Sequence, residues 1–531
     1  MGNETPRRRS FFDELGFSPS ITAVCDEIRG LYLADDTPWV IGYSGGKDST
    51  AVAQLVWMAL ASLEGPDRNK KPVYVITTDT LVENPIIATW VRTSLATLKT
   101  TASAQNLPFH PELLEPPPAD SFWVNLIGKG YPAPRPGFRW CTERLKIKPT
   151  SRFIENTASQ YGEAILLLGA RKAESSVRSA SLTKRETLSK EGLTAHPELV
   201  STLVYAPIQD WSNDDVWTFL MRSPNPWGQS NKELMALYRG ATEDNECPIV
   251  VDTSTASCGN SRFGCWVCTL VDQDKSMKAM IQNDVDKTWM RPLLELRNDL
   301  DFRGDAQRQR ELDRRDFRRL RGSPQLNRTG EDLIPGPYVQ AARAEWLTKL
   351  LRAQMTIRRN PDAPEHVRNI ELVTQGELRA IREIWVSQKH EIEDLLPKIV
   401  LEVTGEPYTD AQEETPVMDS EALAVLEAAT GGDRLHYETL RNLLDVEYQF
   451  RKGATAIARR GLFKNLEVSL ESGFFRDRAD ALDWAKSQAT LLSVPESSHY
   501  VADAVDGVRE EDIAYAAEAV LALDQESVNA I

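Results

Sequence analysis

Seven residues near the N-terminus, Ser44 to Thr50 with the sequence SGGKDST, have the types and order that bind a phosphate group. An apolar run, 39–43, precedes them and a helical pattern, 51–61, follows them. This pattern predicts a strand, a glycine loop and a helix start in direct succession. Such a junction points free backbone N–H groups and the positive end of a helix dipole at a bound anion. Lys47 adds a mobile cation, but Asp48 follows it directly, so this is not a Walker A loop.

Four cysteines in one short segment are the second candidate for chemistry. They are spaced C-x10-C-x6-C-x2-C, and they are Cys247, Cys258, Cys265 and Cys268. Four thiolates suit either structural zinc or a [4Fe–4S] cluster. A zinc ribbon usually has two C-x2-C pairs, whereas this segment has one pair, uneven spacers and no nearby histidine. The spacing therefore favours an iron–sulfur cluster over zinc.

A further cysteine, Cys141, lies in the basic sequence RWCTERLKIKP at 139–149. Four flanking cations predict a lowered pKa and a reactive thiolate, which would suit a persulfide carrier. The alternative is an ordinary buried cysteine that behaves as a small hydrophobe.

The sequence GARKAESSVR at 169–178 follows an apolar run and carries two more candidate anion-binding cations. Arg171 and Arg178 could reach an anion at the end of the sheet, with Glu174 orienting them. The alternative is a surface helix with internal ion pairs. The arginines of 303–321 could likewise contact a polyanion such as nucleic acid, although a helix paired by its own acids is the favoured interpretation for most of them.

The elements that must position these residues alternate between strand and helix. Strands are expected at 39–43, 73–77 and 164–168, and helices at 50–63 and 85–105. Unbroken apolar strands predict an α/β fold with a doubly wound, mostly parallel sheet. Ligands of such sheets bind beyond the carboxyl ends of the strands, where the loops 44–50, 78–80 and 169–171 would meet. Asp79 belongs to the second of these loops.

Composition limits the class of protein. The 531 residues carry a formal net charge of −16, which argues against a surface covered with nucleic-acid-binding groups but not against a local basic patch. Apolar stretches are too short to span a bilayer and the first twenty residues lack a secretory signal, so a cytoplasmic location with no membrane partner is expected. Six cysteines in a chain of this length do not indicate a disulfide framework.

The motifs together resemble a known superfamily. SGGKDS resembles the PP-loop of the ATP pyrophosphatases, which cleave ATP to AMP and pyrophosphate. GARKAESSVR resembles the G-x-R-x-x-E-S-x-x-R signature of the adenylylsulfate and phosphoadenylylsulfate reductases. With RWCTERLKIKP, ECP at 246–248 and CGNSRFGCWVC at 258–268, the chain resembles the DndC family of bacterial DNA phosphorothioation over residues 20 to 360.

This resemblance implies an ATP-dependent sulfurtransferase that adenylates a DNA phosphate oxygen, which sulfur then replaces. It implies ATP with Mg²⁺ and a [4Fe–4S] cluster as cofactors. The implied partners are a cysteine desulfurase as sulfur donor, other DNA phosphorothioation proteins and DNA. The candidate catalytic residues are Lys47, Asp48 and Cys141. The candidate nucleotide-binding residues are Ser44, Gly45, Gly46, Lys47, Asp48, Ser49, Asp79, Gly169, Arg171, Glu174 and Arg178.

Six segments are expected along the chain. They are a helical lead-in at 1–35, a PP-loop ATP pyrophosphatase domain at 36–245, a cysteine-rich iron–sulfur segment with an arginine-rich helix at 246–322, a helical region at 338–410, a small helical domain at 415–490 and an acidic tail at 491–531. Three other functions stay open, namely a sulfonucleotide reductase, a tRNA thiolase and a non-catalytic scaffold subunit. The reductases carry a C-terminal catalytic cysteine, whereas this sequence has no cysteine after Cys268.

Overall fold

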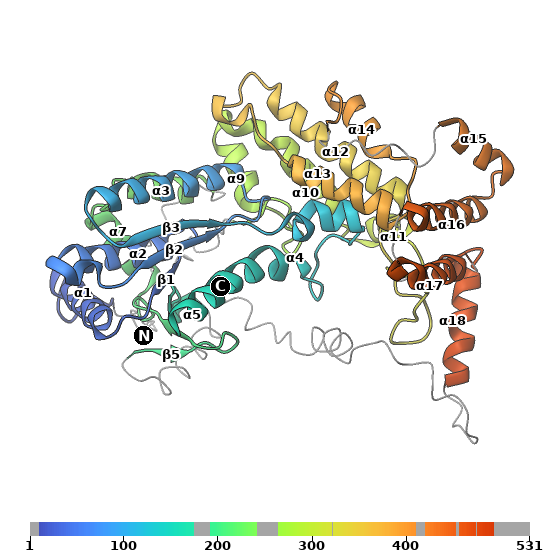
Figure 1. The fold of residues 1–531 in the computed structure, drawn as a ribbon. Helices are drawn as coiled ribbons and strands as arrows, with labels where there is room; N and C mark the ends of the chain where they lie inside the picture. The colour runs from blue at the N-terminus through green and yellow to red at the C-terminus, as the bar shows by residue number, and fades with distance from the viewer. Residues whose placement is uncertain are drawn as a thin grey trace, which may run out of the picture. The chain divides into compact units, whose positions relative to one another are not determined.

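A computed structural model describes residues 10–174, 192–241, 264–320, 322–409, 420–452, 456–473 and 475–492. Within these residues the chain forms two compact units (Figure 1). The first contains the residues up to 116 and those from 134 to 294, and the second contains 117–133 and the residues from 295 onward. None of the described helices is both long and apolar enough to cross a membrane.

The first unit is built on a six-stranded sheet with the order β3-β2-β1-β4-β6-β5. The strands are β1 (Trp39–Gly42), β2 (Val73–Thr78), β3 (Phe109–Leu114), β4 (Ala164–Leu167), β5 (Thr194–Ala195) and β6 (Thr202–Tyr205). All neighbours pair in parallel except β5, which runs antiparallel to β6. The expected strands at 39–43, 73–77 and 164–168 are confirmed.

Helices cover both faces of this sheet. Successive residues of β1 pack into two different apolar clusters, one on each face. Trp39 and Ile41 of β1 pack in a cluster with α1 (Phe17–Ala34), α2 (Lys47–Ala61), α3 (Pro85–Ala104), α7 (Asn213–Arg222) and α8 (Asn231–Gly240). Val40 packs on the opposite face with Ile154 of α5 (Lys148–Tyr161). Figure 1 shows α3 and α5 on opposite sides of the strands. The sheet is therefore doubly wound, as the sequence predicts.

The strand order reverses direction between β1 and β4. The chain runs outward from β1 to β2 and β3, and then returns to the other side of β1 to form β4 and β6. Loops leaving β1 and β4 diverge at this point, so a crevice is expected beyond their carboxyl ends. The glycine loop at 44–46 and the segment at 168–171 are the two loops that flank it.

Short elements complete the first unit. They are η1 (Gly65–Asn69), α4 (Trp140–Thr142), η4 (Glu143–Ile147), η5 (Lys172–Glu174), α9 (Lys275–Asn283) and η6 (Val285–Met290). The helix α10 (Arg291–Leu300) crosses the boundary between the two units.

The second unit is helical and includes a segment that leaves the first unit after β3. Residues 117–133 form η2 (Pro118–Asp120) and the π-helix η3 (Val124–Lys129), and Trp123 and Ile127 are fully buried. Trp385 donates its indole N–H to the Ile127 carbonyl at 2.9 Å, so this segment is part of the helical core. The other elements are α11 (Asp305–Asp313), α12 (Gln340–Arg358), η7 (Glu365–Val367), α13 (Gln375–Glu383), η8 (Ile384–Gln388), α14 (Leu395–Thr404), α15 (Ser420–Ala429), α16 (Arg434–Lys452), α17 (Ala456–Ser472) and α18 (Arg478–Leu492).

Candidate active site

The glycine loop after β1 adopts a backbone that only glycine tolerates at one position. Gly45 has φ +69°, and a Cβ there would lie 2.5 Å from Cγ2 of Val91. Trp90 fixes the same residue by donating its indole N–H to the Gly45 carbonyl at 3.1 Å. A side chain at position 45 is therefore excluded, because α3 packs directly against the loop.

The start of α2 presents its backbone N–H groups without a side-chain cap. Gly46 is the N-cap residue and makes no side-chain capping bond. The Ser49 hydroxyl instead folds back on the loop, where it donates to the Gly46 carbonyl at 3.1 Å and accepts from the Ser44 N–H at 3.2 Å. A helix start of this kind leaves N–H groups available for an anion.

Asp48 joins the two loops that flank the crevice. Its Oδ2 accepts from Lys47 Nζ at 2.9 Å and its Oδ1 accepts from Arg171 Nε at 2.6 Å. Arg171 is only 4% exposed and also donates to the Trp211 carbonyl at 3.4 Å. Gly169 makes this approach possible, because a Cβ there would lie 2.8 Å from the Asp48 carbonyl carbon. The structure thus brings the predicted loops 44–50 and 169–171 together.

Tyr238 of α8 is a site residue that the sequence motifs do not reveal. Its hydroxyl accepts from the Lys47 backbone N–H at 3.3 Å, and Lys47 Nζ lies 5.5 Å from the centre of its ring. Burial, together with the charge of Asp48, raises the pKa of the Tyr238 phenol. No motif surrounds this tyrosine in the sequence, and the chain separation of about 190 residues hides the contact.

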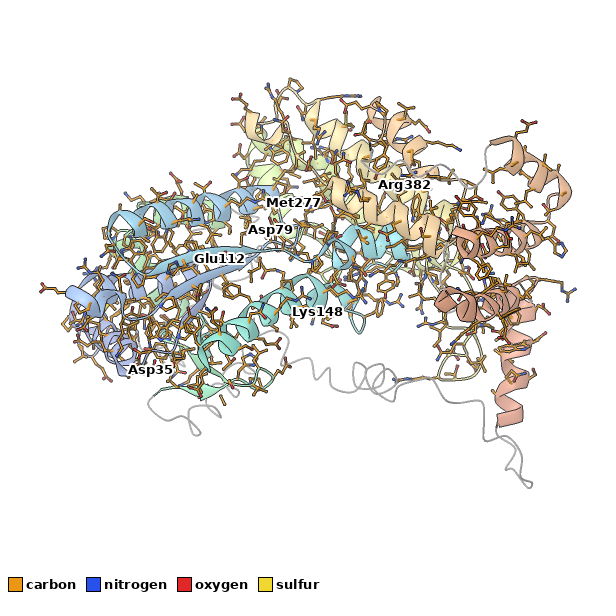
Figure 2. The ribbon with its side chains drawn as sticks, in the orientation of Figure 1. Asp35, Asp79, Glu112, Lys148, Met277 and Arg382 are labelled. Atoms are coloured by element: carbon orange, nitrogen blue, oxygen red, sulfur yellow. The ribbon has the colours of Figure 1, made fainter. Side chains whose placement is uncertain are left out.

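Asp79 lies at the same edge of the sheet, just beyond β2, and Figure 2 shows it at the opposite end of the strands from Asp35. Its carboxylate accepts from the Leu81 N–H at 2.9 Å and from Arg92 Nη2 at 2.6 Å. Leu81 has φ +63°, so Asp79 stabilises an unusual turn. Of the other predicted residues, Glu174 lies in η5 with only its backbone described, and Arg178 lies outside the described residues.

The close cysteine pair of the metal candidate attaches to the loop after β2. Cys265 forms a β-bridge with Glu83, and the Trp266 N–H donates to the Val82 carbonyl at 2.9 Å. The Cys265 thiol lies 3.3 Å from the Thr80 hydroxyl. Cys268 donates its backbone N–H to the Cys265 carbonyl at 3.1 Å, which is the tight turn that a C-x2-C pair needs.

The expectation of a lowered pKa at Cys141 is wrong. Burial, together with the charge of Cys268, raises the pKa of this thiol to about 11. Two of the flanking cations are neutralised, since Lys146 pairs with Glu83 at 3.4 Å and Lys148 pairs with Glu143 at 3.4 Å.

Whether a metal or cluster fits this region depends on where its cysteine thiols lie. The charge of Cys141 contributes to raising the pKa of the Cys265 thiol, and that of Cys268 to raising the pKa of Cys141, so these three thiols lie in the same part of the first unit. Cys247 and Cys258 lie outside the described residues. Among the described residues no group of three or more donors is already arranged to hold a metal ion. The fit thus rests on the chemistry of the thiols, which are soft ligands that suit a thiolate-bound centre.

The arginines after residue 303 pair mainly with carboxylates of their own unit. Arg314 contacts Glu345 at 2.7 Å, and Arg315 contacts Glu311 at 2.8 Å. Arg318 contacts Asp316, also at 2.8 Å. These three arginines are thus paired with acids, but the expected single helix paired by its own acids is wrong in part, because α11 ends at Asp313 and Arg314 pairs with Glu345 of α12.

Comparison with known proteins finds similarity over part of the chain. Residues 38–270 match the family model described as the phosphoadenosine phosphosulfate reductase domain. An uncharacterized protein of Methanocaldococcus jannaschii is 24% identical over 265 residues, which are 49% of this chain and 42% of that protein. The chain thus spans well under half of that relative's length.

Two solved structures are similar to part of the chain. One is the phosphoadenylyl-sulfate reductase of Candida auris in a phosphate complex, with 13% identity, a TM-score of 0.25 and coverage of 41% of this chain and 91% of that one. The other is the U34-tRNA thiolase NcsA of Methanococcus maripaludis with its [4Fe-4S] cluster, with 14% identity, a TM-score of 0.24 and coverage of 41% and 72%.

Proposed function

We propose that this chain, which carries a phosphoadenosine phosphosulfate reductase-like domain of the PP-loop superfamily at residues 38–270, is the ATP-dependent sulfurtransferase of a DNA phosphorothioation system. It would use ATP to adenylate a non-bridging oxygen of a DNA phosphate and then install sulfur in its place. The DNA acceptor comes from the family resemblance of the motifs, and the chemistry comes from the arrangement of the site.

The observation that carries the proposal is the Lys47–Asp48–Arg171 group at the switch point of the sheet. Two cations, Lys47 and Arg171, contact the one carboxylate of Asp48 at the start of α2. This combination suits an anion that gains charge as a bond breaks, such as departing pyrophosphate. Asp48 would orient Lys47 and Arg171 toward the phosphates of ATP, which would enter with its Mg²⁺.

The sulfur step would take place close to this nucleotide site. The loop after β2 carries Asp79 near the predicted nucleotide and also holds Cys265 through Thr80 and Glu83. Cys141 lies within electrostatic range of the Cys265 and Cys268 thiols. A phosphate activated at the end of the sheet would therefore lie close to the sulfur-bearing residues, because the loop that carries Asp79 also contacts Cys265.

The proposed reaction balances without an external oxidant. A DNA phosphate oxygen attacks the α-phosphorus of ATP, and pyrophosphate leaves. A hydrosulfide equivalent then attacks the DNA phosphorus, AMP leaves with the original oxygen, and the sulfur proton passes to solvent. Delivery as a Cys141 persulfide would need a second thiol to attack the Cys141 sulfur, and an external thiol would then reduce the resulting disulfide.

A [4Fe–4S] cluster would be held by Cys247, Cys258, Cys265 and Cys268, and it would supply a sulfur-binding and electron-transfer centre when bound. Anaerobic purification followed by iron and acid-labile sulfide assays tests this assignment. About four irons and four sulfides per chain support it. Stoichiometric zinc without iron contradicts it.

The function is tested by combining the full chain with ATP, a cysteine desulfurase, cysteine and either duplex DNA or transfer RNA. The account expects AMP, pyrophosphate and DNA phosphorothioate in equal amounts. Thiolated transfer RNA without modified DNA indicates a tRNA thiolase. Reduction of a sulfonucleotide without ATP cleavage indicates a reductase, and modification of DNA by partner proteins while this chain cleaves no ATP indicates a scaffold.

A further inference from the structure

A tight, hydrogen-bonded turn lies just before Cys141 in the sequence. Arg135 and Phe138 exchange both backbone hydrogen bonds, with the Phe138 N–H donating to the Arg135 carbonyl at 2.8 Å and the Arg135 N–H donating back at 3.2 Å. Pro136 and Gly137 occupy the two central positions, and Gly137 has φ +82°. Proline followed by a positive-φ glycine is the sequence that a type II turn requires.

This turn presents an aromatic side chain to solvent. Phe138 is 39% exposed, and Arg135, Pro136 and Gly137 are also exposed. Two residues later Trp140 is buried and anchors the segment. Exposing an aromatic ring at a rigid tip forgoes burial that would otherwise stabilise the fold, so this phenylalanine is placed where packing does not explain it.

Both ends of the turn connect to the cysteine-bearing segments. Cys141 follows Phe138 by three residues. On the other side the Pro134 carbonyl accepts a buried hydrogen bond from the hydroxyl of Thr269, the residue after Cys268. The turn is therefore attached at its base to the two places where sulfur chemistry is proposed.

The charge around the turn differs sharply from that of the chain. Residues 135–148 contain five arginines or lysines and one glutamate, against a formal net charge of −16 for the whole sequence. Two of these cations pair with Glu83 and Glu143, and Arg135 is the exposed cation beside the exposed Phe138 ring. A cation beside an aromatic ring is a combination by which proteins hold nucleic acid, because cations contact phosphates and aromatic rings stack on bases.

We propose that the Arg135–Phe138 turn holds the DNA next to the phosphate that is modified. Phe138 stacks against a base or wedges into a base step beside the target, and Arg135 contacts a neighbouring phosphate. The inference rests on the proposed function, because it names the part of the chain that engages the DNA acceptor. It assigns a positioning role to both residues, since neither one contacts the reacting sulfur.

The test measures the affinity of the full chain for a fluorescein-labelled 20-base-pair duplex by fluorescence anisotropy at several salt concentrations. Phe138→Ala should weaken binding about 5- to 20-fold, whereas Phe138→Tyr, which keeps the ring, should bind within about twofold of the original protein. Arg135→Ala should lower the slope of log affinity against log salt by about 0.9, as expected for one lost phosphate contact.

Two controls separate the turn from general effects. Phe463→Ala removes a ring that is 77% exposed on α17 of the other unit, and it should leave DNA affinity unchanged. Binding of a fluorescent ATP analogue should be unaltered in every variant, because the turn does not contribute to the glycine loop.

The outcomes distinguish this inference from the proposed function. If the unaltered protein binds the duplex and Phe138→Ala binds it equally well, the turn is not the DNA contact, while the function stands. If the unaltered protein binds transfer RNA but no duplex DNA, the DNA acceptor is wrong and the inference fails with it. Loss of affinity in Phe463→Ala equal to that in Phe138→Ala also overturns the assignment.

Discussion

The two units of this chain both gather charged side chains, but they arrange them differently. At the switch point of the sheet, Asp48 is shared by Lys47 and Arg171, and its carboxylate is 22% exposed. In the helical unit Arg343 pairs with Glu391, and the two side chains are 3% and 6% exposed. In the first group two cations contact one carboxylate and the Lys47 and Asp48 side chains reach solvent, whereas the second is a one-to-one pair that is almost fully buried.

We interpret the Lys47–Asp48–Arg171 group as a candidate ligand site and the Arg343–Glu391 pair as a structural ion pair. Arg343 also donates to the Tyr338 carbonyl at 3.0 Å and lies over the Trp385 ring, so it connects α12 to two other segments. A balanced buried pair leaves no charge for a ligand. The Lys47–Asp48–Arg171 group places two cations at the N-terminal end of α2, a position that favours anion binding. Substitutions should therefore affect function in one unit and stability in the other.

The largest effect is expected from breaking the buried pair. Arg343→Met leaves Glu391 buried without its partner, which should lower the free energy of unfolding by about 3–5 kcal/mol. Chemical denaturation monitored by circular dichroism measures this loss. The double variant Arg343→Met/Glu391→Leu should recover most of it, and ATP-analogue binding by the folded protein should not change. Equal stability of the single variant and the original protein would contradict the structural role.

Removing the cation of the glycine loop should impair activity and leave stability almost unchanged, which is the opposite of the effect expected for Arg343→Met. Lys47→Ala should slow pyrophosphate release by about 10²–10³-fold, because a preorganised charge that stabilises the leaving group is lost. The free energy of unfolding should change by less than about 0.5 kcal/mol. Lys70→Ala, at an exposed lysine of the same unit, serves as the matched control and should release pyrophosphate normally. A fully active Lys47→Ala variant would remove the basis for the adenylation step.

A methyl group at Gly45 should disturb both function and stability. The added Cβ meets Val91 at 2.5 Å in a left-handed backbone, so Gly45→Ala should destabilise the protein by about 1–3 kcal/mol and weaken ATP binding. Gly65→Ala also has a positive φ but meets no atom within 4 Å, and it should show backbone strain alone. If the two variants behave alike in ATP binding, packing of α3 against the loop is not what shapes the site.

The smallest effect concerns pH and the helical unit. Burial, assisted by the Arg343 charge, lowers the pKa of Lys389 from 10.5 to about 8, against the opposing effect of Glu391 and Asp316. Between these two pH values the unfolded chain binds more protons, so the free energy of unfolding should rise by about 1–2 kcal/mol as pH increases from 8 to 10. Denaturation of the original protein and of Lys389→Met over this range measures the difference. Parallel pH profiles would show that Lys389 does not contribute.

Much of the first unit follows from the sequence because its signals are local. Apolar runs at 39–43, 73–77 and 164–168 become the central strands, since helices cover both faces of the sheet. β3 escapes prediction because it is a partly exposed edge strand that contains Pro111. The four cations around Cys141 lead to a wrong prediction of its pKa. Glu83 and Glu143 pair with two of these cations, and burial raises the pKa of the thiol more than the other two lower it.

Contacts between distant residues are the part that sequence reasoning does not supply. Arg171 and Asp48 each belong to a recognised motif, yet their ion pair depends on β4 lying beside β1. Tyr238 has no motif at all. The turn at 135–138 reads in sequence as a Pro-Gly loop, and only its exposure and its link to Thr269 make it a candidate for DNA contact. Local patterns thus identify residues, whereas topology decides which of them meet.

The central claim, adenylation of the DNA oxygen that sulfur replaces, is tested most directly by isotope tracing. A duplex carrying ¹⁸O at the non-bridging oxygens of the target phosphate is incubated with the full chain, ATP and the sulfur donor, and the released AMP is analysed by mass spectrometry. The account predicts AMP that carries one ¹⁸O atom for each phosphorothioate formed. Unlabelled AMP alongside modified DNA would contradict it.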